Sequence, residues 1–312
     1  MRIEFQGNLP TFRMISSECH QQFSDIIPHQ VDRYADFFGF GKLSLTGFSQ
    51  EKATEKNKMR KKRFMKLLSL NSSSRYIPTF IDNLEKISSN WHKGQTYGMV
   101  KEMNYFTFTV FAHILFGKDL EHIVMREVEY INNSNEIIKT PFRDFFVLLL
   151  KDLAYGWVHP LTLICPSLNK YDLINPFERN IKNIKIFWEV LKDLMSKCKD
   201  KDSIYCQLMA DEETTESDAF EDIITFLIGG TETSSHSITS TLYYLYKNPA
   251  KKEILIKEFE ENGFGKGHSG EQYTIDNIHK MDYLNFVVKE SLRMDSPGPE
   301  ALQYQAVQDV MI

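Results

Sequence analysis

Residues 220–247, FEDIITFLIGGTETSSHSITSTLYYLYK, form the longest helical pattern in this sequence. Apolar residues recur along it at helical spacing. Near the middle the pattern is interrupted by Gly229 and Gly230, which are followed by Thr231, Glu232 and Thr233. Each glycine in a helix interior costs about 1 kcal/mol relative to alanine. Because a helix that only fills a core has little use for this pair, the interruption indicates a functional site or a close contact.

On a helical wheel, five residues of this stretch fall within one narrow sector: Phe226, Gly229, Gly230, Thr233 and Ser237. The small residues predict a groove in which a flat ligand can approach the backbone. The Thr233 hydroxyl is expected in the groove, where it can also bond the carbonyl one turn back. The alternative interpretation is a helix–helix crossing with small residues at the contact.

Composition bounds the class of protein. The chain has 312 residues, a net charge of −5 and 42% hydrophobic residues, enough for a sizeable core. Its mild acidity argues against nucleic acid as a partner. The four cysteines are widely spaced and read as reduced thiols. The N-terminus lacks the apolar stretch of a signal peptide, and no apolar run is long enough to span a membrane.

Periodicity and breaker residues predict a mainly α-helical chain with little β-structure. Residues 128–153 are expected to be largely helical, with Pro141 marking a break or a start, and 200–217 to be an exposed loop. Asp218 with Glu221 is a start signal for the central helix. The remaining helices are expected at 25–40, 75–91, 100–116, 177–197, 249–262 and 283–294, and residues 301–312 are expected to be extended.

Charged residues give two further candidates. Within the basic run 51–66, Lys62, Arg63 and Lys66 can share one helix face and bind an anion, although a solvated face is an equal alternative. Glu290 and Arg293 are spaced i, i+3 and can form an ion pair. On the wheel this pair lies opposite the apolar stripe, which by itself would place it in water.

The order of the motifs resembles the cytochrome P450 family. Gly229–Ser234 matches the [A/G]-G-x-[D/E]-T-[T/S] motif of the family's long central helix, and Glu290–Arg293 matches its later E-x-x-R motif. YLNFVVKESLRMDSPGP resembles the usual surroundings of the second motif, and ILFGKDL at residues 114–120 resembles the end of an earlier helix. The resemblance extends from about residue 39 to residue 312, and it implies a single, partial P450-like domain over residues 1–312.

If the resemblance holds, the chain has the helical fold of a haem-thiolate monooxygenase, which inserts one atom of O2 into an organic substrate. Glu232 and Thr233 then match the acid–alcohol pair that delivers protons, and Gly229 and Gly230 admit the haem face. Arg63 and Lys66 are the cationic candidates for haem binding. Glu290 and Arg293 become a structural pair bonded into the core beneath the haem.

The resemblance also implies partners and a location. It implies an electron-donating reductase and a small organic or lipid-like substrate. A full-length form would be membrane-associated on the cytosolic face of the endoplasmic reticulum. The aromatic connection at 155–177 is a candidate for lining an entry channel or for contact with a membrane surface, and the alternative is a loop that is simply packed.

Several departures from the family pattern lead to a second hypothesis. The family's haem-ligating cysteine follows E-x-x-R in an F-x-x-G-x-x-x-C-x-G loop, and Cys19, Cys165, Cys198 and Cys206 lie in no such context. Tyr304 stands where the family often has an arginine, and the tryptophan of W-x-x-x-R is missing. We therefore expect a piece lacking the ligand cysteine and inactive alone; the alternative is a non-catalytic helical remnant or interaction protein that binds no haem.

Overall fold

The computed structural model describes residues 2–6, 9–13, 29–30, 55–157, 177–264, 273–297 and 304–305. Helices dominate these residues, as the sequence predicts, and the described strands pair only two by two. The longer helices are α3 (Glu55–Leu67), α5 (Ile77–Ser88), α6 (Met99–Phe116), α8 (Phe142–Trp157), α10 (Phe177–Lys197), α12 (Glu216–Lys247), α13 (Pro249–Glu261) and α15 (Asp282–Met294).

Shorter elements connect these helices. They are α4 (Leu70–Ser73), α7 (Glu121–Val124), α11 (Ile204–Met209), α14 (Ile275–His279) and the 3-10 turns η2 (Ser74–Tyr76) and η3 (Lys118–Leu120). The strand pairs are antiparallel: β1 (Arg2–Gln6) with β2 (Leu9–Arg13), β3 (His29–Gln30) with β6 (Tyr304–Gln305), and β4 (Glu127–Ile131) with β5 (Ile137–Pro141). The expected helix at 25–40 and most of the connection at 155–177 lie outside the described residues.

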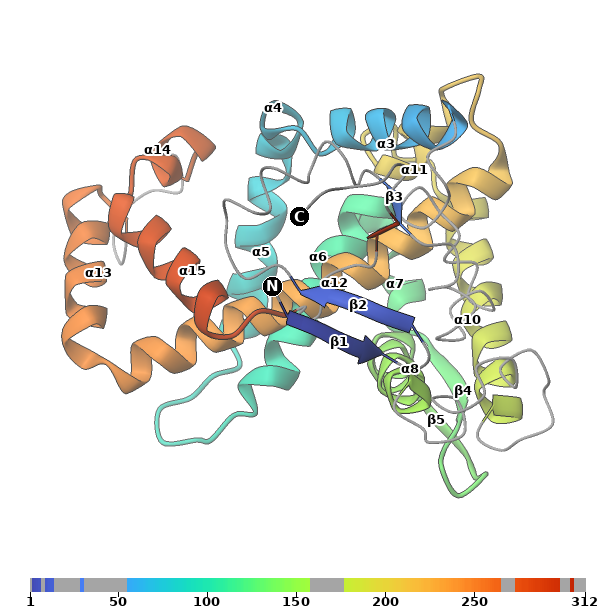
Figure 1. Ribbon diagram of the computed structural model, residues 1–312, viewed down its shortest axis with the longest axis horizontal. Helices are drawn as coiled ribbons and strands as arrows, with labels where there is room; N and C mark the ends of the chain where they lie inside the picture. The colour runs from blue at the N-terminus through green and yellow to red at the C-terminus, as the bar shows by residue number, and fades with distance from the viewer. Residues whose placement is uncertain are drawn as a thin grey trace.

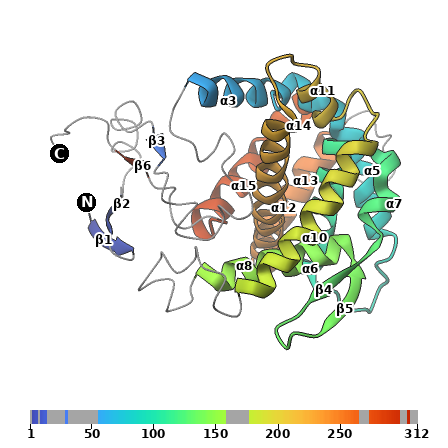
Figure 2. The ribbon, with the colours of Figure 1, turned by 90° about the vertical axis from the view of Figure 1, so that its right-hand side faces the viewer.

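Helix α12 runs through the middle of the molecule, and α6 packs along it (Figure 1). Helices α13, α14 and α15 gather near one end of α12, whereas α8, α10 and the β4–β5 hairpin lie toward its other end (Figure 1). The quarter-turned view keeps α12 central among the helices (Figure 2). The long central helix predicted at 220–247 is confirmed, with its start four residues earlier.

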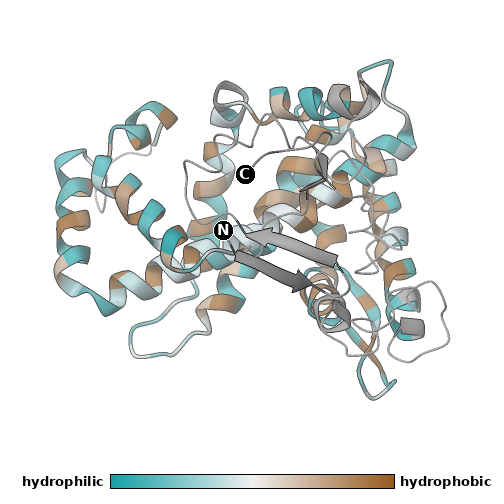
Figure 3. Ribbon diagram, viewed as in Figure 1, coloured by the Kyte–Doolittle hydropathy of each residue, from teal (hydrophilic) through white to brown (hydrophobic). Residues whose placement is uncertain are grey.

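The core forms where α6 meets α8, α10 and α12. Helix α6 is buried along most of its length, which suits a sequence that is apolar on all sides. Phe108 lies 4.9 Å from Phe146 between ring centroids, and Phe142 stacks on Phe187 at 5.9 Å. Helices α13 and α15 instead alternate hydrophilic and hydrophobic residues along their length (Figure 3).

Residues 128–141 form a β-hairpin, so the prediction of helix there was wrong. Val128 and Tyr130 are buried and alternate with exposed neighbours, which is the period of a strand. Asn135 takes a positive φ of 60° in the turn, a conformation that asparagine tolerates. The Asn132 side-chain oxygen accepts from the backbone N–H groups of Ser134 and Glu136. Pro141 does precede a helix, because α8 begins at Phe142.

The exposed loop predicted at 200–217 was also partly wrong, because it contains α11. This short helix buries Ile204 and Leu208 against the core. Its first turn is capped by Ser203, whose hydroxyl accepts from the Cys206 backbone N–H at 3.2 Å. Likewise α12 starts at a Thr215 cap, whose hydroxyl accepts from Asp218 N–H at 3.1 Å. Asp218 is therefore the recipient of the cap and not the cap itself.

Candidate functional site

The glycine-bearing turn lies within α12, which stays helical from Glu216 to Lys247. Gly229 is exposed, and a methyl group added to it would meet nothing within 4 Å. Thr233 lies one turn later on the same face and is also exposed. Its hydroxyl donates to the Gly229 carbonyl at 2.5 Å, the back-bond expected from the sequence. This face of the helix is therefore open.

Two more hydroxyls continue the same row beyond Thr233. Ser237 donates to the Thr233 carbonyl at 2.8 Å, and Thr241 donates to the Ser237 carbonyl at 2.8 Å. Each hydroxyl thus uses its proton on the backbone one turn back, while its oxygen keeps lone pairs for a donor from outside. We call Thr233, Ser237 and Thr241 the hydroxyl row.

Gly230 serves a different purpose from Gly229. A methyl group built on it would lie 2.6 Å from the Phe111 ring of α6, closer than carbon atoms approach. The next residue continues the contact, because Thr107 donates its hydroxyl to the Thr231 carbonyl at 3.0 Å. One of the two glycines therefore belongs to a helix crossing and the other to the open face. The narrow sector of the helical wheel therefore contains one residue of each predicted kind, an open groove at Gly229 and a helix–helix crossing at Gly230.

Glu232 lies next to the hydroxyl row and has a perturbed acidity. Although much of its side chain is exposed, its carboxyl loses part of its hydration to surrounding residues. This desolvation raises the pKa of Glu232 above the usual value, and His236 one turn later offsets part of the rise. A carboxyl with a raised pKa holds its proton closer to neutral pH, as a proton donor should.

His236 in turn faces the C-terminal end of α15. Its Nε2 lies 3.2 Å from Asp295 Oδ1, and the other oxygen of Asp295 accepts the Ser240 hydroxyl at 2.6 Å. The Ser240 hydrogen bond, helped by His236, lowers the pKa of Asp295. This tie between α12 and the residue after Met294 was not predicted from sequence, where only the proline break that follows was noted.

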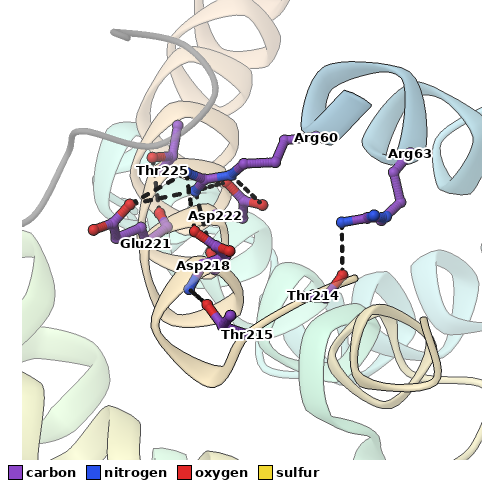
Figure 4. A network of polar contacts seen from close by, with 8 residues as sticks. All are labelled: Arg60, Arg63, Thr214, Thr215, Asp218, Glu221, Asp222 and Thr225. Atoms are coloured by element: carbon purple, nitrogen blue, oxygen red, sulfur yellow. Dashed lines mark hydrogen bonds and ion pairs between the residues drawn. The ribbon is translucent and has the colours of Figure 1, made fainter. Parts of the chain in front are cut away.

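Much of the basic run lies in α3, where Arg60 binds carboxylates of α12 and Arg63 bonds the Thr214 hydroxyl (Figure 4). Arg63 donates to Thr214 at 2.6 Å and pairs with Asp211 at 2.7 Å. Lys66 is exposed. Before Arg63 could bind a haem it would have to exchange these partners, so its cofactor role stays a prediction, as does that of Lys66.

Arg60 was missed by the sequence analysis, and its side chain is 2% exposed, less than the 14% of Arg63. Its guanidinium is 2.5 Å from Asp222 and also pairs with Glu221 and Asp218 at the start of α12 (Figure 4). Burial opposes its charge, but the hydrogen bond and charge of Asp222 raise the pKa of Arg60 overall. The sequence did contain a signal for this contact, because a basic helix and the acidic first turns of another helix have complementary charges.

Glu290 and Arg293 form their ion pair on α15, with two bonds of 2.7 Å. The side chains are 57% and 69% exposed, so the pair is at the surface. The family-based expectation of a pair bonded into the core therefore differs from this structure, and the wheel placed it correctly. The hydrogen bond between them lowers the pKa of Glu290 and raises that of Arg293.

The apolar stripe opposite this pair is covered only in part. Leu284 and Val287 are half-buried, whereas Val288 and Leu292 are both 39% exposed. Helix α15 contacts α12 and α13, and its first turn is capped by the Glu258 carboxylate of α13, which accepts from the N–H groups of Tyr283 and Leu284. The described residues thus cover one side of α15 and leave much of its remaining surface exposed.

The described residues fit a haem on one side only. The open face at Gly229 can receive a flat group, and the hydroxyl row offers it polar atoms. A thiolate for the opposite side is not offered by Cys198 or Cys206, which lie together beside the end of α6. Cys19 and Cys165 lie outside the described residues. No three His, Cys, Asp or Glu side chains in the described part of the chain are arranged to hold a metal ion.

A long central helix with an open glycine, a back-bonded threonine and an adjacent acid is the arrangement that the family resemblance led us to expect. The comparison with protein families agrees, because residues 27–312 match the cytochrome P450 family model. The chain belongs to the cytochrome P450 family.

Named relatives are distant and longer than this chain. The (1S)-1-hydroxy-luvungin A synthase of Citrus sinensis is 27% identical over 254 residues, which cover 76% of this chain and 46% of the relative. The (21S)-21-acetyl-1-hydroxy-apo-melianone synthase of Melia azedarach is 24% identical, with 70% and 43% covered. Cytochrome P450 monooxygenase cloA of Claviceps purpurea is 23% identical, with 67% and 41% covered. The chain thus spans less than half the length of these relatives.

Within the described ranges, no helix combines the length and the apolar character needed to cross a bilayer.

Proposed function

We propose that this chain provides the oxygen-side face of a haem-dependent monooxygenase that oxidises a small organic or lipid-like substrate. Family membership supports the reaction class. The observation that carries the proposal is the open turn of α12, where Thr233 Oγ1 bonds the Gly229 carbonyl with Glu232 beside it. Bound haem would supply the redox chemistry that activates O2, with electrons from a reductase.

The residues of α12 would move protons on that face. The Thr233 proton is held on the Gly229 carbonyl, and rotation about its side chain would release it toward the open side. Glu232, whose pKa is raised by desolvation, would then return a proton to Thr233 Oγ1 through water. His236, held 3.2 Å from Asp295, would lie beside Glu232 and favour its ionised form.

Gly229 would keep the face flat, and Gly230 would fix its angle. Because Gly230 allows the Phe111 ring to lie against α12, α6 supports the helix from behind while Gly229 faces open space. We assign Arg63 and Lys66 as the cations to be tested for a role toward the haem, and Glu290 with Arg293 as a pair that supports α15.

The absorbance of the purified chain with haem, reduced and exposed to carbon monoxide, tests this proposal. A band at the thiolate-ligated position would show that a cysteine of this chain serves as ligand, with Cys19 and Cys165 to be distinguished by serine substitution. A haem spectrum without the thiolate band would support the open face and confirm the expected lack of a ligand. Absence of bound haem would favour the alternative, a non-catalytic helical protein of the same family.

A further inference from the structure

A pair of cysteines away from the α12 face forms a chemically defined site of its own. Cys198 follows α10, and Cys206 lies in α11. Their sulfur atoms are 3.5 Å apart, close to van der Waals contact, and both side chains are partly buried. Joining them requires a closing movement of only about 1.5 Å, since a disulfide bond is about 2 Å long.

The turn between the two cysteines holds them in place. The Asp200 carbonyl accepts the Ser203 hydroxyl at 2.6 Å, and the Asp200 carboxylate accepts the Asp202 N–H at 2.9 Å. Asp200 also packs on Gly117, where a methyl group would lie 2.7 Å from its carboxylate and where φ is +90°. The turn is therefore fixed against the end of α6, and the two sulfur atoms meet without rearrangement of the helices.

The two thiols have unequal surroundings. The Cys198 S–H donates to the Phe116 carbonyl at 3.2 Å, and its sulfur also lies 3.2 Å from the Ser203 hydroxyl. Burial, the largest cause, raises the pKa of the Cys198 thiol to about 11, so little of it is thiolate at neutral pH. Cys198 is thus slow to react with peroxide itself, and its sulfur, 3.5 Å from that of Cys206, is placed to attack an oxidised neighbour.

We propose that Cys206 and Cys198 form a peroxide-responsive dithiol site, in which Cys206 is oxidised first and Cys198 closes the disulfide. The Cys206 sulfur loses its proton and attacks hydrogen peroxide, the O–O bond breaks, and the leaving hydroxide takes up that proton, so that a sulfenic acid and water form. The Cys198 sulfur then attacks the Cys206 sulfur, the S–O bond breaks, and a second water leaves with the Cys198 proton. Two thiols are oxidised by two electrons, and one peroxide is reduced to two waters.

Oxidation of this dithiol site would change a contact at the end of α6, which forms part of the core. Closing the disulfide turns the Cys198 sulfur from the Phe116 carbonyl toward Cys206, which removes a bond from the last turn of α6. This site is independent of haem binding, because neither cysteine lies on the open face of α12.

Peptide mapping of the folded chain after peroxide treatment tests the proposal. After the peroxide treatment, the remaining free thiols are blocked with N-ethylmaleimide. Trypsin then cleaves after Lys197, Lys199 and Lys201, so the two cysteines fall in different peptides. We expect one linked peptide pair, lighter by two hydrogen atoms than its reduced parts and absent when the oxidation is done in urea. Oxidation of both cysteines to sulfinic or sulfonic acid without a link would overturn the proposal.

Single substitutions test the order of events. In Cys198→Ser, dimedone should label Cys206, whereas in Cys206→Ser the same peroxide dose should leave Cys198 unlabelled. The reverse labelling would contradict the assigned roles. Phenylarsine oxide, which bridges neighbouring thiols, provides a test on the unmodified chain, so misfolding of a variant cannot mask the result. It should protect both cysteines from N-ethylmaleimide, and failure to protect either one would count against the pair.

Discussion

Alanine at position 230 should destabilise the protein, whereas alanine at position 229 should stabilise it. The two glycines are neighbours in one helix, so the intrinsic gain in helix propensity is the same for both, about 0.5–1 kcal/mol. At Gly229 the new methyl group meets nothing within 4 Å, and the full gain should be measured. At Gly230 it meets the Phe111 ring at 2.6 Å.

The size of the loss follows from what the Phe111 ring touches. The ring packs edge-on against Phe226 at 5.2 Å, and Phe226 packs on Phe64 at 5.4 Å, so the ring cannot turn away without disturbing its neighbours. Overpacking of this kind costs about 1–3 kcal/mol. The two variants should therefore differ by about 1–3 kcal/mol in the free energy of unfolding, or roughly 2–6 °C in Tm.

Urea unfolding followed by circular dichroism measures both variants against the wild-type chain. Adding Phe111→Leu to Gly230→Ala is the matched rescue, since a smaller side chain makes room for the methyl group. Equal stabilities for the two alanine variants would refute the division between a crossing glycine and an open glycine. So would a Gly230→Ala loss that Phe111→Leu leaves unchanged.

Three more expectations concern charge, pH and chemistry. Arg60→Met should lower the free energy of unfolding in urea by about 3–5 kcal/mol, because it removes the buried partner of Asp222. The control Arg293→Met, at the exposed pair, should leave the urea midpoint unchanged. Similar losses in the two variants would contradict the assigned difference in burial. Burial lowers the pKa of His113 in the folded chain, so below about pH 6.5 the unfolded chain binds a proton that the folded chain does not. The stability of the wild type should therefore fall as the pH drops through that value, and that of His113→Gln should fall less. Parallel pH profiles of stability for the two proteins would argue against this role of His113. In an active holoenzyme, Thr233→Ala should release peroxide in place of product, and unchanged coupling of oxygen use to product would remove Thr233 from proton delivery.

Much of the helical framework could be predicted because it depends on local patterns. Helices at 100–116 and 177–197 match α6 and α10 to within a residue, since apolar spacing and breakers such as Gly117 mark their bounds. The hairpin at 127–141 was missed because its strands are short and apolar runs of that length fit either period. The Asn132–Asn135 turn was the available signal, and it was read as part of a helix.

The features of the candidate site that lie within one helix could be predicted from the sequence, but its contacts with other helices could not. Thr233 and its back-bond to Gly229 follow from helix geometry, so the sequence was sufficient for them. The difference between Gly229 and Gly230 depends on where Phe111 of α6 lies, which is a tertiary fact. The same holds for the partners of Arg63 and for the surface position of Glu290 and Arg293, because amphipathicity and family resemblance favoured opposite answers there.

We expect the open turn at Gly229 to be the face that receives haem. Haem titration followed by Soret absorbance should show binding to the wild-type chain and an affinity weakened by roughly tenfold or more, about 1.4 kcal/mol, in Gly229→Phe. Leu242→Phe, at an exposed position on the same helix, is the control and should bind as the wild type does. Equal affinity of Gly229→Phe and the wild type, or no binding to either, would contradict this expectation.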